Sequence, residues 1–205
     1  MRLSLALFAA VALAWSGNVA AQSNLAPRSE NYFAFRAGAY VPQSNDLDAY
    51  NTGVGADFAV GRKFNPNLAL EFGLGSFWIA TDEVAFVDAF GPYTEKWEAR
   101  AIPLTATAKG ILPAGALDVY VLGGLGMYFV DAKFTQTDSI DGWSESWSDS
   151  DTTVGLHFGG GAAITVNPQW KLAFEMRYHV AKATLFNVDT SLDGLQLSGG
   201  LQFAF

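Results

Sequence analysis

The sequence of 205 residues contains no cysteine, only two histidines, and 12 basic residues against 20 acidic ones. The absence of cysteine excludes disulfides and cysteine-ligated metals, and two histidines make a poor transition-metal site. A formal net charge of −8 disfavours nucleic acid as a partner and electrostatic docking onto an anionic membrane surface. We therefore expect no transition-metal site, no cofactor and no nucleic-acid partner.

Long apolar runs are also missing after the first 21 residues, although 50% of the chain is hydrophobic. A membrane helix needs about 20 consecutive apolar residues, and no later segment approaches that length. The chain is instead rich in glycine (21 residues) and phenylalanine (16 residues). This composition favours a membrane β-barrel.

The N-terminal segment has the pattern of a secretory signal peptide. Arg2 precedes an apolar run that ends at Trp15, and small residues lead up to Ala21. The apolar run is too short for a comfortable spanning helix, although an uncleaved anchor is the alternative. We expect residues 1–21 to be removed and the barrel domain to comprise residues 22–205.

Eight later segments can be read as strands, and most alternate between an apolar face and a polar or small face. They lie near residues 31–41, 52–64, 68–78, 104–109, 118–130, 154–166, 170–178 and 195–205. Most run to about nine to eleven residues, the length of a tilted strand that crosses a bilayer. The segment 118–130 is apolar on both faces, so its orientation stays open.

The connections between these segments alternate in length. Tight, mostly proline-marked turns are expected at 65–67, 112–117 and 167–169, and longer polar loops near 42–51, 79–97, 131–152 and 180–192. Short turns at one end and long loops at the other are typical of outer-membrane barrels with both termini in the periplasm. The sequence thus predicts an all-β, eight-stranded antiparallel up-and-down transmembrane β-barrel.

A soluble lipocalin-like barrel also has eight strands and is the alternative. The aromatic residues favour the membrane, because two rings of aromatics suit two membrane interfaces. The periplasmic ring would contain Phe33, Phe64, Trp170 and Phe205, and the outer ring Trp78, Trp97, Phe129 and Tyr178.

Two kinds of motif resemble known outer-membrane proteins. The C-terminal "GGLQFAF" looks like the terminal strand that the barrel-assembly machinery recognises. The resemblance implies an assembly signal at Gly199, Leu201, Phe203 and Phe205. The segments "NPNLALEFGLG" and "NPQWKLAFEMRY" resemble strands of the small Gram-negative family that includes outer membrane proteins A, W and X. This second resemblance implies that the protein is inserted in the outer membrane, in contact with its lipid and lipopolysaccharide.

The polar faces of the strands carry charges of both signs. These are Arg36, Asp57, Glu71, Lys109, Glu175 and Arg177, with His157 and Lys171 nearby. An eight-stranded barrel is only wide enough for side chains to fill, and charges inside a membrane protein are expensive unless paired. We expect an ion-pair network across the lumen.

No residue pattern indicates catalysis. The outer-membrane lipid A deacylases, which are also eight-stranded, carry a His-x-Ser pair, whereas His179 is followed two residues later by Ala181. We therefore expect no enzyme, with His179 a polar residue at the upper rim of the barrel.

The acidic segment 131–151 could bind divalent cations or be a solvated, mobile loop. Its Trp143 and Trp147 would rest on the membrane interface or engage an extracellular partner.

Pro103 predicts a break or a bulge in its strand, because proline cannot donate a ladder hydrogen bond. A bulge would absorb one residue between Arg100 and Thr105 if both side chains point into the lumen. The alternative is that Arg100 lies in loop water.

These observations predict an integral outer-membrane protein with a structural or surface-interaction role and a lumen plugged by charged side chains. The alternative, which the resemblance to the protein W branch allows, is a narrow conduit for small hydrophobic solutes.

Overall fold

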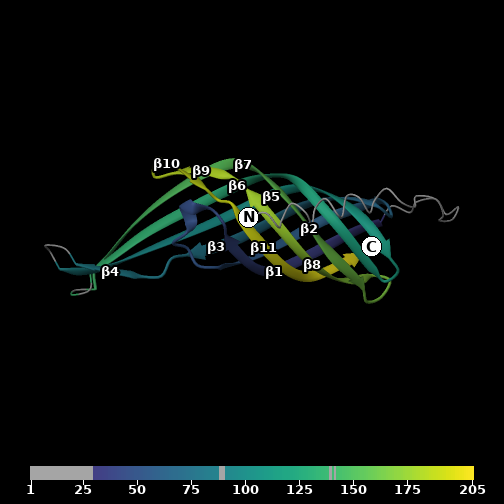
Figure 1. Cartoon of the computed structure of the whole chain (residues 1–205), viewed down its shortest axis with the longest axis horizontal. Coiled ribbons are helices and arrows are strands. Elements are labelled where there is room, and N and C mark those ends of the chain that lie inside the picture. The colour runs from purple at the N-terminus through teal and green to yellow at the C-terminus, as the bar shows by residue number, and fades with distance from the viewer. Residues whose placement is uncertain (1–29, 88–90, 139, 141) are drawn as a thin grey trace.

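Antiparallel pairing of neighbouring strands continues around the molecule and closes it into a barrel. The computed structural model describes residues 30–87, 91–138, 140 and 142–205, so the expected signal peptide at 1–21 lies outside them. Within the described residues a ring of eight antiparallel strands closes on itself (Figure 1). The ring strands are β1 (Glu30–Pro42), β2 (Gly53–Asn65), β3 (Leu68–Ala80), β5 (Pro92–Ala114), β6 (Leu117–Asp138), β7 (Ser144–Thr165), β8 (Trp170–Val180) and β11 (Gly194–Ala204). The predicted eight-stranded antiparallel barrel is confirmed.

The C-terminal strand is not an edge. β11 pairs with β8 on one side and with β1 on the other, in a ladder that runs from Tyr32–Ala204 to Pro42–Gly194. The backbone N–H of Phe205 donates to the carbonyl of Asn31 at 2.9 Å. The apolar terminal strand is therefore protected by pairing on both sides, which removes the open edge that would invite aggregation.

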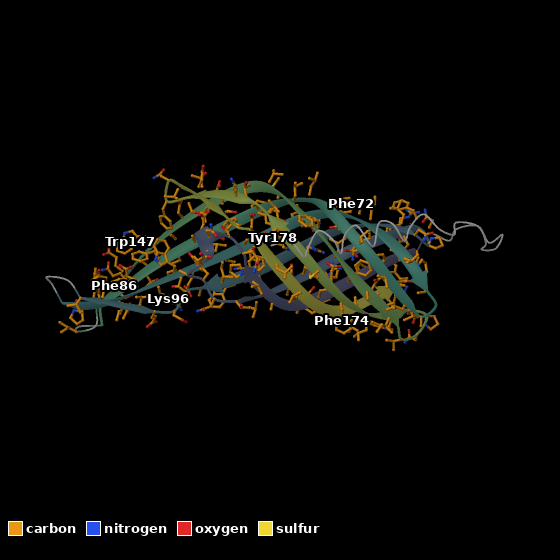
Figure 2. All side chains as sticks on the ribbon, viewed as in Figure 1. Phe72, Phe86, Lys96, Trp147, Phe174 and Tyr178 are labelled. Atoms are coloured by element: carbon orange, nitrogen blue, oxygen red, sulfur yellow. The ribbon has the colours of Figure 1, made fainter. Side chains whose placement is uncertain are left out.

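The wall has an apolar outer face and a mixed inner face. Phe72 is 68% exposed and Phe174 is also exposed, and Figure 2 shows both on the barrel wall. Their neighbours Glu71 and Glu175 are buried in the interior. The orientation of the fifth segment, which the sequence left open, is set by pairing in β6: Tyr120 is buried and Val119 exposed. No helix in the described part of the chain is long and apolar enough to cross a membrane.

Three strands are much longer than the sequence predicted. β5, β6 and β7 contain 23, 22 and 22 residues, so the loops expected at 79–97 and 131–152 are in large part strands. The short strand β4 (Val84–Val87) pairs with the outer part of β5. These strands project beyond the ring, toward the left in Figure 1. We call this projection, residues 84–87, 92–98, 131–138 and 144–153, the extension.

Cross-strand aromatic pairs stabilise the strands of the extension. Trp97 lies opposite Phe134, and Phe134 lies opposite Trp147. Such pairs stabilise neighbouring strands by roughly 0.2–1 kcal/mol each. The sequence prediction considered only strands of the length that crosses a bilayer, so it did not include these pairs. The acidic segment 131–151 is thus a β-hairpin in its described part, not a mobile loop. Trp97 faces these rings instead of lipid, so its predicted place in the outer aromatic ring is wrong.

A second hairpin and a short helix lie at the same end of the barrel as the extension. They are β9 (Lys182–Leu185), β10 (Val188–Ser191) and the 3-10 helix η2 (Asn45–Leu47). The hairpin turns through Phe186 and Asn187, which both have positive φ. Asp149 and Asp151 of β7 accept hydrogen bonds from the backbone N–H groups of Phe186 (2.6 Å) and Thr184 (2.7 Å). The hairpin is therefore tied to the base of the extension.

The expected bulge before Thr105 is absent. β5 pairs with β6 without a register shift through Pro103. On the other side, the pairs Leu74–Leu104 and Phe77–Ala101 keep one register, but the positions between them are unpaired. Arg100 is exposed, and its Nε donates to Ser76 Oγ at 3.3 Å. No extra residue is needed, because Arg100 points away from the lumen; Pro103 leaves only a local break in the β3–β5 ladder.

Inward tyrosines lie against glycines of the neighbouring strand. A Cβ added to Gly61 would lie 2.2 Å from Cζ of Tyr32, and one added to Gly161 would lie 2.7 Å from Cζ of Tyr120. Both distances are far shorter than a van der Waals contact between carbons. These glycines make room for the rings, and the rings carry hydroxyl groups into the lumen.

Candidate functional site in the barrel lumen

Arg36 is buried in the lumen and contacts three carboxylates from three other strands. Its Nη2 is 2.6 Å from Asp57 Oδ2 and 3.2 Å from Glu71 Oε2, and its Nη1 is 3.1 Å from Glu175 Oε2. The guanidinium fork suits several carboxylates at once, since it presents five donors in fixed directions. One side chain of β1 thereby links β2, β3 and β8.

Two further cations complete the set. Lys109 Nζ is 2.7 Å from Glu71 Oε1 and 2.9 Å from Glu175 Oε2, and Arg177 Nη2 is 2.5 Å from Glu175 Oε1. The six residues Arg36, Asp57, Glu71, Lys109, Glu175 and Arg177, which we call the charge cluster, thus lie together. Three positive and three negative charges cancel, as a buried network requires.

Two tyrosines that sequence reasoning missed also belong to this network. The hydroxyl of Tyr32 donates to Glu71 Oε1 at 2.9 Å, and that of Tyr120 donates to Glu175 Oε2 at 3.1 Å. Lys109 Nζ also lies 4.5 Å from the centre of the Tyr120 ring. Tyr32 is four residues before Arg36 on β1, so the two lie on the same face of the strand. Its place in the lumen could therefore have been predicted from the sequence. That of Tyr120 could not, because the orientation of its segment was open.

Water has little access to the charge cluster. Arg36 and Glu71 are each 2% exposed, and the other members are also buried. Electrostatic attraction is strong in such surroundings, while a member that lost its partner would remain as an uncompensated buried charge. The arrangement is suited to holding strands together and filling the lumen.

A layer of neutral polar groups lies beside the charge cluster. His157 Nε2 is 2.8 Å from Thr107 Oγ1, and the two ring nitrogens of His179 are 2.9 Å from Tyr128 Oη and 3.0 Å from Gln196 Oε1. Both histidines are 1% exposed. His179, expected at the upper rim, is therefore buried near the end of β8. In this position it is a hydrogen-bonding core residue.

The lumen toward the extension is filled by apolar side chains. Tyr40 and Phe77 stack with ring centres 4.1 Å apart, within a buried group that includes Ile79, Val130 and Leu185. A cavity of ≈ 10 Å³ lies at the border with the charge cluster, next to Pro103. That volume is about one water probe, too small for a solute.

The opposite end of the lumen contains a separate ion-pair group. Asp118 Oδ2 is 2.7 Å from Lys171 Nζ and 3.2 Å from Lys63 Nζ. The sequence placed Lys171 near the charge cluster, whereas its ion pair is with Asp118. Among the described residues no group of three or more His, Cys, Asp or Glu side chains could hold a metal ion.

The four residues of the expected assembly signal lie along β11 and just beyond it. Leu201 and Phe205 are exposed on the wall, and the Phe205 ring stacks on Phe33 with centres 4.6 Å apart. Phe203 packs on Trp170 at 4.9 Å. A Cβ on Gly199 would meet the Phe174 ring at an ordinary 3.5 Å. The aromatic residues therefore gather where β11 meets β1 and β8.

A closed barrel with an apolar wall and a buried ionic interior can be compared with known families. The model of the outer membrane protein beta-barrel domain matches residues 4–205. The chain belongs to this family. Family membership and fold together make it an integral outer-membrane protein of the Gram-negative type, in contact with membrane lipid. None of the curated proteins is similar enough to count as a match.

Solved structures of small outer-membrane barrels show the same fold. Neisserial surface protein A is 17% identical over 87% of this chain and 99% of its own, with a TM-score of 0.54. A major outer membrane protein of Thermus thermophilus is 16% identical, covering 86% and 99%, with a TM-score of 0.55. OprG of Pseudomonas aeruginosa is 13% identical, covering 89% and 99%, with a TM-score of 0.52. At these identities the likeness concerns the fold alone.

Proposed function

We propose that this family member is a structural and surface-interaction protein whose lumen is closed by the charge cluster. The observation that carries the proposal is the set of ion pairs centred on Arg36 and Glu175, which joins β1, β2, β3, β5 and β8. A solute would have to break several buried ion pairs to pass. The side chains serve to hold the strands together, and we propose no catalytic role for them.

We further propose an orientation for the barrel. Its tight turns would face the periplasm with both termini, and the extension would face the exterior, as in barrels with short periplasmic turns and long outer loops. Residues 1–21 would act as the signal peptide. Gly199, Leu201, Phe203 and Phe205 would be recognised by the barrel-assembly machinery, and lipopolysaccharide would surround the outer half of the wall.

Planar-bilayer recordings test the closed lumen. The wild-type protein is expected to give no large, steady conductance steps, because the charge cluster and the apolar layer fill the interior. The Glu98→Gln variant, which alters a partly exposed ion pair with Lys96 on the extension, serves as the control and should behave like the wild type. Large steady steps from the wild-type protein would overturn the proposal.

A narrow conduit for small hydrophobic solutes is the second candidate. It is favoured by the unpaired positions in the β3–β5 ladder beside Pro103, since the ≈ 10 Å³ cavity adjoins them. Passage would require side chains such as Phe77 to move. Uptake of a small hydrophobic fluorophore by proteoliposomes, without ionic conductance, would place this candidate ahead of the closed barrel.

A further inference from the structure

The inner face of the extension is aromatic; at its base Phe186 of the β9–β10 hairpin packs edge-on against Trp97, and farther out Phe86 and Trp147 are exposed. This face contains the side chains that continue the lumen-facing alternation of β5, β6 and β7, together with those opposite them on β4. Trp97, Phe134 and Trp147 form one row with centres 4.5 and 5.5 Å apart, and Phe86 stacks on Tyr93 at 5.6 Å. Trp147 is 42% exposed, and Figure 2 shows it with Phe86 out on the extension. Exposed aromatic surface of this kind marks a contact site.

On the outer face of the extension, positive and negative side chains lie next to one another and their charges cancel. Lys96 Nζ lies 3.2 Å from Glu98 Oε1, and Glu98 also lies opposite Lys133 in the ladder. Arg100, at the base of the extension, is the ladder partner of Asp131. The outer face thus offers a balanced, solvated surface with no net attraction for a charged partner.

The inner face has acids without bases. Glu95, Asp138, Glu145, Asp149 and Asp151 lie on it, and no lysine or arginine does among the described residues of this face. Asp149 and Asp151 accept backbone N–H groups of the β9–β10 hairpin, which supply no formal positive charge. The aromatic rings therefore lie in a negative potential.

The acids and rings alternate at a spacing that fits arginine. Tyr93, Glu95 and Trp97 follow one another on the same face of β5, two residues and about 7 Å apart. Glu145, Trp147 and Asp149 repeat the pattern on β7. A guanidinium can stack on an aromatic face while its N–H groups bind a carboxylate beside the ring. A lysine ammonium lacks the planar surface for stacking.

We propose that the inner face of the extension binds an extended, arginine-rich peptide segment of another protein. The inference rests on the proposed surface-interaction role and names the chemistry of the partner. Insertion into the membrane surface is disfavoured, because the five carboxylates on this face would meet the anionic lipopolysaccharide. A second copy of this chain is disfavoured too, since its extension offers basic residues only on the self-neutralised outer face.

The test uses the full mature protein in phosphatidylcholine nanodiscs and a fluorescein-labelled peptide of alternating arginine and serine. Fluorescence anisotropy is expected to show saturable binding that weakens at high salt and is absent with empty nanodiscs or a glutamate–serine peptide. Glu145→Gln should weaken binding about fivefold through the lost charge-assisted bond. The matched control Asp131→Asn removes the same charge from the outer face and should bind like the wild type. Trp147→Ala should also weaken binding.

Several results would overturn the inference. These are the absence of peptide binding, equal binding by Glu145→Gln and the wild type, quenching of Trp147 fluorescence by brominated lipid, or self-association that the Trp147→Ala change abolishes. Heat-dependent electrophoretic mobility checks that each variant is folded. Conductance is measured on the same samples: a non-conducting barrel without peptide binding refutes only this inference, whereas large conductance refutes the closed lumen whatever the peptide does.

Discussion

At the scale of single residues, we expect substitutions in the charge cluster to have the largest effect on stability. Glu71 accepts bonds from Lys109, Arg36 and the Tyr32 hydroxyl, and it is 2% exposed. A buried ion pair need not add much net stability compared with apolar packing, but a single deletion leaves the other charge without a partner. A single substitution in such a site should therefore cost more stability than a double substitution that also removes the partner charge. This difference in stability can be measured.

We expect Glu71→Ala to lower the free energy of unfolding by about 3–5 kcal/mol. Glu71→Ala combined with Lys109→Met should lose less than the single change, because the cluster returns to neutrality. Urea unfolding in detergent, followed by tryptophan fluorescence, measures both.

Glu98→Ala is the matched control for this cycle. It removes a carboxylate that pairs with Lys96 at 3.2 Å on the extension, where both side chains remain accessible to solvent, and surface pairs contribute about 0–1 kcal/mol. A double variant that is less stable than Glu71→Ala alone would contradict this prediction. It would show that the charge of Lys109 does not need the Glu71 carboxylate to neutralise it.

At the scale of elements, different contacts stabilise the extension and the lumen of the ring. The ladder of β6 and β7 continues through Lys133 and Ser148 as far as Thr137 and Ser144. The ion pairs of the charge cluster all lie within the ring. The extension is thus stabilised by its own strand pairing and aromatic contacts, and the ring by closure and the lumen.

Replacing residues 134–147 by an Asn-Gly turn should leave the barrel folded, because Lys133 and Ser148 are already paired and this dipeptide suits a two-residue hairpin. We expect a stability loss of only ~1 kcal/mol from the lost Trp97–Phe134 contact. Heat-dependent electrophoretic mobility and the urea midpoint provide the measurement. Failure of the shortened protein to fold would show that the ring depends on the extension.

At the scale of the whole molecule, closure joins the two ends of the described chain. Phe205 lies beside β1, with its N–H on Asn31 and its ring on Phe33. The ladder between β1 and β11 holds the rest of the seam through many backbone hydrogen bonds. A single terminal residue therefore contributes little to the completed fold.

Deleting Phe205 should impair assembly in cells more than refolding in detergent, because the proposed role of this residue is recognition. Outer-membrane levels measured by immunoblot should fall, while the yield of refolded protein in vitro stays near that of the wild type. Unchanged levels in the membrane would count against an assembly signal at this position.

The alternation of apolar and polar residues by itself determined the barrel and most of its faces. Period-two patterning is local, so Arg36 and Glu71 could be assigned to an inner face from their own strands. A strand with two apolar faces, such as that of Tyr120, carries no such local signal. Its orientation needed the pairing with β5 and β7.

Only the tertiary structure decided which residues meet. Arg36 and Glu175 are 139 positions apart, and their contact depends on the register and closure of the whole ring, which no local pattern encodes. The same reason explains why Lys171 pairs with Asp118, why Arg100 points outward, and why the segments expected as loops became the extension. Local chemistry sets the face of each side chain, whereas strand register sets its partner.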